Sequence, residues 1–455
     1  MSAIMVQGTA SSVGKSLLTT ALCRIWARRG LRVAPFKAQN MSLNAAVTPD
    51  GGEIGRAQLA QAEAARVRPH VDMNPILLKP ESLSGSQVVV LGRAVGSMHF
   101  SDYRRHNGEL REIVGAAFDR LHAAHDVVVI EGAGSPAEVN LRDGELVNMW
   151  MAARASAPVV LVTDIERGGA LAAIVGTLEL LTTDERARVQ ALVVNKFRGD
   201  RALFADGVRF LEERTGIPVA GVVPHLGDTG IAGEDSLELD RGRTGGVAVV
   251  QLPHLSNFDE FDGLDARFVD DAAALAGARL VIVPGTKCTV DDLAWLRARG
   301  LADALVARAR AGGAIVGICG GYQMLGERIA DPDGVESRAG EVAGLGLLPV
   351  VTTFARDKVT EQVRVRLPDG SERDGYEIHC GRVERRGGRP FATIVRRGER
   401  AVDEAEGCVA GSVTGTLVHG LYERRAPERE DRYDALADQF AAALDLSLLD
   451  RLAGL

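Results

Sequence analysis

The sequence predicts an α/β protein with two domains, each built around a mostly parallel sheet. Short runs of β-branched residues alternate with amphipathic stretches, a pattern typical of parallel strands joined by helices. The chain has 455 residues, which is enough for two or three separate cores. Its 52 glycines and its aromatic content of 4% suit many tight strand-to-helix turns better than an all-β sandwich.

The first 235 residues contain six short apolar runs that we interpret as buried strands. An amphipathic stretch follows the first run and places Leu18, Leu22 and Ile25 on one helical face. Strands that alternate with helices in this way predict a doubly wound parallel sheet. The expected strands are residues 4–7, 32–36, 127–131, 159–163, 192–195 and 219–223.

A polar, glycine-rich passage then interrupts the alternation, and we assign residues 236–246 as a linker. A second α/β series follows, so we expect a second domain over residues 247–445. Two later apolar runs lie among turns, which favours antiparallel pairing. The expected strands are residues 247–252, 280–283 and 314–318, with the antiparallel runs at 362–367 and 391–395.

Composition and charge exclude several classes of protein. The formal net charge of -8 argues against a nucleic-acid binder that works through bulk positive charge. No apolar segment approaches the length of a membrane span, and the N-terminus has no charged-then-apolar leader. The five cysteines are few and scattered, so a disulfide framework is not expected. We therefore expect a cytoplasmic protein that binds neither nucleic acid nor membrane.

A phosphate-binding loop lies between the first expected strand and the first helix, where residues 8–16 read G-T-A-S-S-V-G-K-S. Backbone N–H groups and the helix dipole at such a turn hold phosphates, the lysine reaches the outer phosphates, and the last hydroxyl can bind Mg²⁺. Five residues rather than four separate the two glycines, which departs from the standard spacing. Counting from the threonine restores that spacing but places threonine where glycine is expected. The ATP contacts expected here are Gly8, Thr9, Ser12, Gly14, Lys15 and Ser16.

Two further strand ends are expected at the same site. Glu131 ends the run V-V-V-I-E, where a second Mg²⁺ ligand beside Ser16 is expected. Asn195 and Lys196 end another strand and are candidates to border the purine base of ATP.

Polar side chains are dense between residues 37 and 79, after several strand ends. Amides and cations gathered in this way suit a polar anionic substrate such as a polycarboxylate. The segment D-I-E-R-G-G at residues 164–169 closes another strand, and we expect it to line the same crevice. The candidate substrate-binding residues are Lys37, Gln39, Asn40, Arg56, Lys79, Asp164 and Arg167.

The second half contains a cysteine at a strand-to-helix turn. The segment G-I-C-G-G at residues 317–321 follows an apolar run and precedes a helical pattern. This arrangement is the thiol version of the nucleophile elbow, in which the glycines permit the sharp turn and the helix N-terminus favours the thiolate. We interpret Cys319 as a nucleophile.

A thiol nucleophile requires a base, and the base can lie far away in the sequence. His419 is the best placed, in a glycine-bounded turn late in the same domain, while His254 and His379 remain alternatives. The segment V-P-G-T also ends a strand beside the elbow. The N–H groups of Gly285 and Gly320 are therefore expected to form an oxyanion hole.

Together these motifs resemble a known family over nearly the whole chain. The loop at 8–16 and the E-G-A-G at 131–134 are similar to the dethiobiotin-synthetase-like P-loop ATPases. The G-I-C-G-G elbow with a late His-Gly resembles the class I, triad-type glutamine amidotransferases. This combination of an ATPase and a glutaminase is characteristic of the cobyrinic acid amidating enzymes. The segments that carry the finer resemblance are F-K-A-Q-N-M-S-L-N, G-E-I-G-R-A-Q, D-I-E-R-G-G, N-K-F-R-G-D, L-P-H-L-S-N-F and G-Y-E-I-H.

The resemblance implies a ligase of cobalamin biosynthesis that amidates the b, d, e and g carboxylates of adenosylcobyrinic acid a,c-diamide to give adenosylcobyric acid. It implies a corrinoid polycarboxylate as substrate, ATP and glutamine as co-substrates, and Mg²⁺ as cofactor. In the family, ATP activates each carboxylate and ammonia from the glutaminase half attacks it. This agrees with the chemistry of the residues, because a carboxylate resists amines until its oxygen becomes a leaving group.

One position departs from the family pattern. Triad-type members carry a glutamate two residues after the histidine, and here Leu421 stands in that place. Either Cys319 and His419 act as a dyad, or another carboxylate such as Glu423 or Glu377 orients the histidine.

Two rival functions are less consistent with the sequence. The enzyme that amidates the a and c carboxylates shares both halves, but Gln39-Asn40 and the segment at 164–167 favour the later step. A partitioning-type ATPase with an inert amidotransferase-like module usually begins with K-G-G-x-G-K, which this chain lacks.

Overall fold

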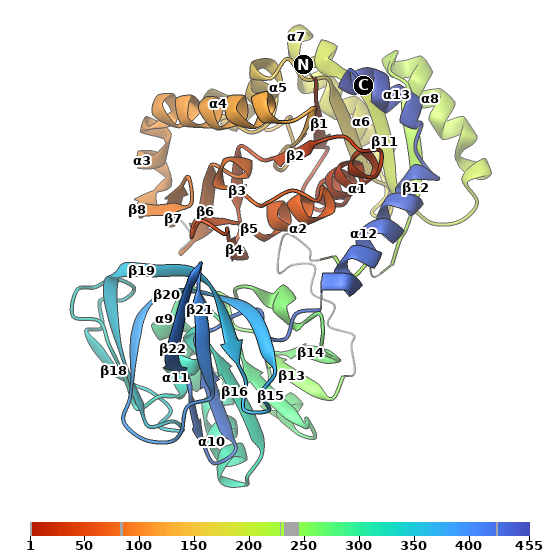
Figure 1. Ribbon diagram of the computed structural model, residues 1–455. Helices are drawn as coiled ribbons and strands as arrows, with labels where there is room; N and C mark the ends of the chain where they lie inside the picture. Colours follow the sequence, from red (N-terminus) through yellow and green to blue (C-terminus); the bar gives the residue numbers. More distant parts are fainter. Residues whose placement is uncertain (1, 82–84, 228, 232–244, 425) are drawn as a thin grey trace.

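The computed structural model describes residues 2–81, 85–227, 229–231, 245–424 and 426–455. Two lobes are stacked one above the other in Figure 1, and each contains an α/β core. The expected linker at 236–246 lies mostly outside the described residues.

The upper lobe contains the first predicted sheet. All six expected strands are present and pair in parallel in the order β12-β11-β10-β1-β9-β2. This order places β1 in the middle, so the loop that follows it emerges where the connections diverge to either side. The strands are β1 (Ser2–Gly8), β2 (Val33–Phe36), β9 (Val127–Glu131), β10 (Val159–Asp164), β11 (Val189–Phe197) and β12 (Val219–Pro224).

Helices cover both faces of this sheet, because its strands are apolar on both sides. Side chains of α4, α5, α6 and α8 pack on one face, and those of α1 on the other. The helices of this half are α1 (Lys15–Arg28), α2 (Arg56–Ala64), α3 (Phe100–Arg105), α4 (Asn107–Ala124), α5 (Met149–Arg154), α6 (Ala170–Leu180), α7 (Thr183–Arg188) and α8 (Ala205–Thr215).

A smaller sheet and a hairpin lie on the side of the upper lobe that faces the lower lobe (Figure 1). The sheet has the order β3-β6-β7-β8, and β4 pairs with β5 in antiparallel fashion. These strands are β3 (Gln39–Met41), β4 (Ala45–Val47), β5 (Glu53–Gly55), β6 (Ile76–Pro80), β7 (Gly85–Val90) and β8 (Arg93–His99).

The lower lobe contains the second α/β series. Its sheet has the order β14-β13-β15-β16-β24-β23, parallel except for the pairing of β23 with β24. All three expected core strands are present. The elements are β13 (Val247–Val250), β14 (Ala266–Val269), β15 (Leu280–Val283), β16 (Ala314–Ile318), β23 (Cys408–Ala410), β24 (Val413–Thr416), α9 (Thr289–Ala298), α10 (Leu301–Arg310) and α11 (Gly320–Leu325).

A third sheet packs beside it, and it contains the two runs for which antiparallel pairing was expected. Its long strands β19 and β20 form a hairpin whose register shifts once along its length. The strands are β17 (Arg328–Ala330), β18 (Glu341–Ala343), β19 (Val350–Arg366), β20 (Glu372–Arg385), β21 (Ala392–Arg397) and β22 (Arg400–Glu406).

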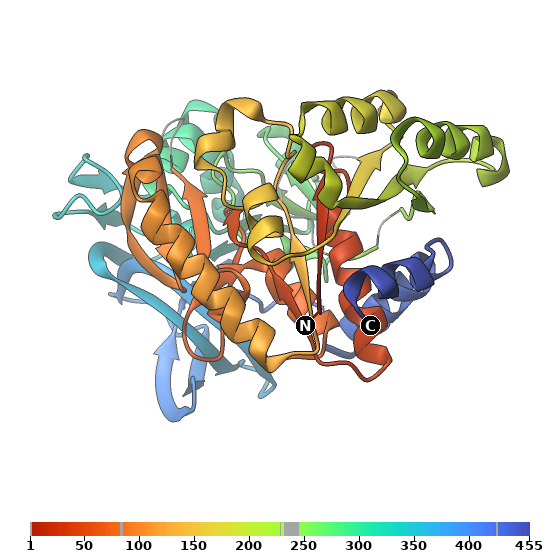
Figure 2. The same cartoon turned by 90° about the horizontal axis from the view of Figure 1, so that it is seen from above.

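The last two helices, α12 (Ala426–Ala441) and α13 (Leu446–Ala453), return to the upper lobe. Phe440 and Leu449 lie in the same apolar cluster as Ile4 and Leu18, so these helices complete the face that α1 covers. The two ends of the chain also meet, since Ser2 Oγ donates to the Gly454 carbonyl at 3.1 Å (Figure 2). The second domain was expected to extend to residue 445, which includes α12, whereas the structure packs α12 on the first sheet together with α13.

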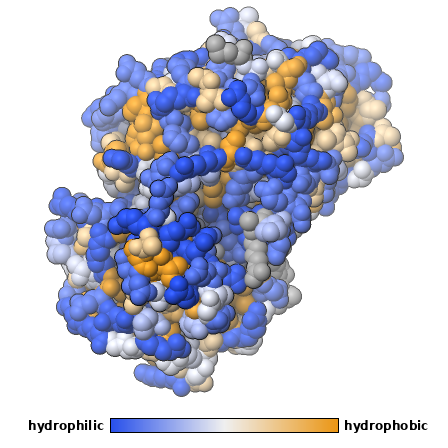
Figure 3. All heavy atoms as spheres, in the orientation of Figure 1, coloured by the Kyte–Doolittle hydropathy of each residue, from blue (hydrophilic) through white to orange (hydrophobic). Residues whose placement is uncertain are grey.

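The face of the molecule in Figure 3 is mostly hydrophilic, and its apolar residues form small separate patches. Among the described residues, no helix is both long and apolar enough to cross a membrane.

Candidate active sites

The phosphate loop connects β1 to α1, as expected. Lys15 is buried, and its Nζ donates to the carbonyls of Ala10 at 2.9 Å and Gly134 at 3.2 Å. Gly14 has a φ of 100°, and a Cβ there would lie 2.0 Å from Nδ2 of Asn195. Only glycine therefore fits this position.

Asn195 and Lys196 support the loop from the end of β11. Asn195 Nδ2 donates to the Val13 carbonyl at 2.8 Å, and Lys196 Nζ donates to the Ser12 carbonyl at 2.7 Å. Thr9 ties the loop to β10, since its hydroxyl donates to that of Thr163 at 3.1 Å. These predicted ATP-binding residues thus hold the shape of the loop in the structure.

Glu131 lies at the centre of a buried polar cluster behind the loop. Its Oε1 accepts from Ser16 Oγ at 2.8 Å and from Lys37 Nζ at 2.9 Å, and its Oε2 accepts from Gln61. Burial acts to raise the pKa of Glu131, but Lys37 and the hydrogen bonds outweigh it and hold the pKa below its usual range. The carboxylate is therefore ionised.

The residues at this point fit Mg²⁺. Ser16 and Glu131 present a hydroxyl and a carboxylate oxygen 2.8 Å apart at the phosphate loop. Mg²⁺ prefers hard oxygen ligands and is usually bound by one or two protein groups together with phosphate and water oxygens.

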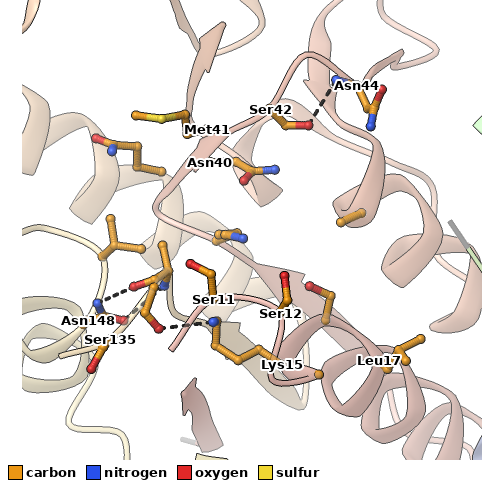
Figure 4. A pocket seen from close by; sticks show the side chains of 18 of the residues that line it. Ser11, Ser12, Lys15, Leu17, Asn40, Met41, Ser42, Asn44, Ser135 and Asn148 are labelled. Atoms are coloured by element: carbon orange, nitrogen blue, oxygen red, sulfur yellow. Dashed lines mark hydrogen bonds between the residues drawn. The ribbon is translucent and has the colours of Figure 1, made fainter. Parts of the chain in front are cut away.

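A cavity of about 1380 Å³ opens in front of the loop, and residues of both lobes line it. Figure 4 shows Ser12 and Lys15 on one side of this cavity and Asn40 and Met41 on another. The lower lobe contributes side chains from the segment after β13. The residues of that lobe that line the cavity are Leu255, Phe258, Asp262 and Phe268.

Four of the seven predicted substrate-binding residues line this cavity: Lys37, Gln39, Asn40 and Arg167. Asp164 lies beside it and pairs with Lys196, Oδ2 to Nζ, at 3.2 Å.

Arg56 and Lys79 are placed elsewhere, and this corrects the prediction. Arg56 forms ion pairs with Asp259 and Glu423 of the lower lobe, and Lys79 pairs with the buried Glu53. Both cations lie at the boundary between the lobes, where buried charge needs an opposite partner. The neighbouring residues Ala57 and Pro80 line the cavity, whereas Arg56 and Lys79 do not.

The cysteine elbow has the predicted geometry. Cys319 lies between the end of β16 and the start of α11 with φ 50° and ψ -110°, a strained conformation for a residue other than glycine. His419 follows β24, which pairs in parallel with β16. Because the carboxyl ends of neighbouring parallel strands lie together, this pairing brings His419 close to Cys319, whose sulfur contributes to raising the pKa of the histidine.

The third member of this site is Glu260, which was not among the residues expected from the sequence. Its Oε1 lies 3.0 Å from Nδ1 of His419, and its Oε2 accepts from the Gly420 N–H at 3.0 Å. The carboxylates considered from sequence have other partners, because Glu423 pairs with Arg56 and Glu377 pairs with Arg397. The arrangement is therefore a triad and not a dyad.

Leu421, which stands where other members carry the glutamate, packs instead into an apolar cluster around Val418. Glu260 precedes His419 by 159 residues, so no local spacing links the two. The sequence did offer one indication of a buried acid, because Glu260 lies between the apolar residues Phe258 and Phe261. A carboxylate that is buried beside such residues needs a specific partner.

The charge of His419 is set by its neighbours. Burial acts to lower the pKa of His419, but the Glu260 carboxylate and the sulfur of Cys319 together raise it to about 10. The ring of Tyr376 stacks on the imidazole, with centroids 5.4 Å apart and an interplanar angle of 14°. His419 is thus a protonated, oriented group beside the thiol.

The two predicted oxyanion-hole glycines border this site. A Cβ on Gly285 would lie 2.7 Å from Cε1 of His419, and one on Gly320 would lie 2.6 Å from Cγ2 of Thr286. The alternative bases are engaged elsewhere, since His254 Nδ1 lies 2.8 Å from Asp292 Oδ1 and His379 Nδ1 lies 2.8 Å from the Gly381 carbonyl.

Comparison with known proteins agrees with this division of the chain. Residues 4–236 match the CobQ/CobB/MinD/ParA nucleotide binding domain, and residues 246–427 match the CobB/CobQ-like glutamine amidotransferase domain. The second match ends near the start of α12, consistent with the return of the last helices to the upper lobe.

Several relatives match this chain over nearly its whole length. The chain is 52% identical to cobyric acid synthase of Sorangium cellulosum (strain So ce56), with 99% of this chain and 98% of the relative covered. It is 49% identical to cobyric acid synthase of Chloroflexus aggregans over 99% of this chain and 98% of the relative. For cobyric acid synthase of Moorella thermoacetica the identity is 47%, over 100% of this chain and 97% of the relative. The chain belongs to the cobyric acid synthase family.

Proposed function

We propose that the protein uses ATP and glutamine to amidate the b, d, e and g carboxylates of adenosylcobyrinic acid a,c-diamide, giving adenosylcobyric acid in the cytoplasm. The observation that carries this proposal is a cavity lined both by the phosphate loop and by the segment that bears Glu260. A phosphate loop and a turn of the thiol site that border the same cavity suit a reaction that needs a phosphorylated acid and a nitrogen source together.

The thiol site accounts for release of ammonia. The sulfur of Cys319 attacks the side-chain amide carbon of glutamine, and the N–H groups of Gly285 and Gly320 stabilise the oxyanion that forms. Protonated His419, held by Glu260, gives its proton to the departing ammonia. His419 then takes a proton from water, and the resulting hydroxide cleaves the thioester and releases glutamate.

The phosphate loop accounts for activation of the acid. A carboxylate oxygen of the corrinoid attacks the γ-phosphorus of ATP, ADP leaves, and ammonia then displaces phosphate from the acyl carbon to form the amide. Lys15 stabilises the charge on the transferred group, while Ser16 and Glu131 would hold Mg²⁺. When bound there, Mg²⁺ supplies further neutralisation of phosphate charge.

The shape and lining of the cavity support a large anionic substrate. At about 1380 Å³ it exceeds the roughly 300–1,000 Å³ of common small-molecule sites. We assign contacts with the corrinoid carboxylates or their amides to Gln39, Asn40 and Arg167, with Lys37 close to the reacting carboxylate.

The rival functions lack comparable support. The three relatives above carry the name cobyric acid synthase over nearly their full length, which does not favour the enzyme acting on the a and c carboxylates. A partitioning-type ATPase with an inert second module does not require Cys319, His419 and Glu260 to be assembled as a triad.

The experiment compares glutamine with free ammonia as the nitrogen source. We expect Cys319→Ala to abolish glutamine-supported amidation of the a,c-diamide and to retain ammonia-supported amidation within about twofold of wild type, because the phosphate loop does not depend on the thiol. Loss of both activities in a folded variant would show that the proposed division of labour is wrong.

A further inference from the structure

A short turn carries two neighbouring acids with partners in different lobes. It comprises Asn257 with φ 55° and the single 3-10 turn Phe258–Phe261. Glu260 holds His419 within the lower lobe, and Asp259 forms an ion pair with Arg56, the first residue of α2 in the upper lobe. The orientation of the catalytic histidine and a contact between lobes therefore depend on the same few residues.

The upper lobe binds this turn at two points. Arg56 pairs with Asp259 and also lies 2.6 Å from Glu423, guanidinium nitrogen to carboxylate oxygen. Beside it, the N–H of Asn257 donates to Oδ1 of Asn44 at 2.7 Å, and Oδ1 of Asn257 accepts from the N–H of Ala45 at 2.9 Å. The backbone of the turn at Asn257 and the side chains of Asn257 and Asp259 are thus held by residues outside the glutaminase domain.

The other face of the catalytic histidine is supported in the same way. Tyr376 stacks on the ring of His419 and belongs to an apolar cluster with Ala45, Val47 and Leu77 of the upper lobe. Both supports of the imidazole, Glu260 and Tyr376, therefore rest on the region of the upper lobe that contains the β4–β5 hairpin.

Arg56 neutralises the buried charge of Asp259. The side chains of Asp259 and Glu260 are adjacent in sequence and almost completely buried, with 3% and 0% exposed. Burying two carboxylates side by side is costly unless each has a cation, and removing one partner leaves an uncompensated charge. Without Arg56, the turn relieves that cost by moving Asp259 toward water, which displaces Glu260 from His419.

We infer that Arg56 is a positioning residue for the glutaminase reaction, acting from the synthetase domain through Asp259 and the Asn257–Phe261 turn on Glu260 and His419. The glutaminase site is complete only while the two lobes are docked at this turn. This inference rests on the proposed function and adds to it a residue that contacts neither glutamine nor the thiol.

A double-mutant cycle on glutamine hydrolysis tests the inference. We expect Glu260→Gln and Arg56→Gln each to lower kcat about tenfold to a hundredfold, with KM for glutamine within about threefold, because a misplaced histidine slows chemistry more than binding. The double variant should be no slower than Glu260→Gln alone, because Arg56 acts through that carboxylate. Arg56→Lys, which keeps the charge, should recover part of the loss.

Ammonia-supported amidation separates this inference from the proposed function. The Arg56 variants should retain it within about twofold of wild type, which also shows that they are folded. Lys358→Met is the matched control, because Lys358 pairs with Glu53 across the same boundary at 2.6 Å but does not contact the turn. This variant should keep its glutaminase rate.

Three results would each overturn the role of Arg56. The first is a kcat of the double variant that falls by the product of the two single losses. The second is a loss of glutaminase rate in Lys358→Met as large as in Arg56→Gln, and the third is a loss of ammonia-supported amidation in the Arg56 variants as large as their loss of glutaminase rate. Absence of amidation by the wild-type protein with either nitrogen source would instead contradict the proposed function.

Discussion

Glu131 and Glu260 are both completely buried, and each holds a cationic side chain at its own site. Glu131 accepts from Lys37 and Ser16 behind the phosphate loop, while Glu260 orients His419 beside the thiol. A buried carboxylate with a defined partner fixes both the position and the charge of that partner. Both sites therefore use a buried carboxylate to hold a cationic side chain in place, although the reactions at the two sites differ.

The pKa of His419 leads to a pH-dependent prediction. Glu260 contributes to raising it to about 10, so the imidazolium is lost only as pH rises through that region. Glu260→Gln removes the raising charge, and the alkaline limb of the kcat/KM profile for glutamine hydrolysis should therefore move to lower pH. An unshifted limb in this variant would show that Glu260 does not set the charge of His419.

Individual residues differed in how far the sequence could place them. Lys15 and Cys319 lie in local motifs whose spacing itself encodes the turn, so their positions were predictable. Glu260 could not be found in this way, because it lies in a turn 159 residues before His419 and only the folded chain brings the two together. Arg56 was misassigned because a cation that follows a strand can serve either in a buried ion pair or in a substrate contact, and the sequence pattern is the same in both cases.

At the scale of helices and strands, the buried strands were the most predictable part of the fold. Continuous β-branched runs between turn residues mark strands that are covered on both faces. The partners of α12 and α13 were not predictable, since an amphipathic helix shows which face is apolar but not which sheet it covers. Arg24 of α1 shows the outcome, because its buried guanidinium pairs with Glu430 and Asp434 of α12.

The packing of α12 predicts where a core substitution acts. Phe440 is buried against the first sheet, so Phe440→Ala should lower the stability of the synthetase domain by about 3–5 kcal/mol through the cavity that it leaves. Calorimetry with and without ATP measures this, because ATP raises the unfolding temperature of the domain that binds it.

Phe210→Ala on the exposed surface of α8 is the control and should change stability by no more than about 0.5 kcal/mol. If Phe440→Ala lowers only a transition on which ATP has no effect, the assignment of α12 to the first domain is wrong.

On the scale of the whole molecule, the two lobes share one cavity and exchange charged partners across their boundary. Lys358 pairs with Glu53 at 2.6 Å, and Lys287 pairs with Glu81 at 2.7 Å, in addition to the pairs of Arg56. Domain order was predictable from the motifs, whereas the contacts between domains were not, because they join side chains that no sequence pattern relates.

The central claim is that one protein converts several carboxylates of a corrinoid into amides at the expense of ATP and glutamine. Mass spectrometry of adenosylcobyrinic acid a,c-diamide after incubation with the enzyme, Mg²⁺, ATP and glutamine tests it most directly. Each exchange of a hydroxyl for an amino group lowers the mass by a fixed step, and we predict a product that has undergone four such steps, with none when ATP is omitted. A corrinoid of unchanged mass in the complete reaction would contradict the account.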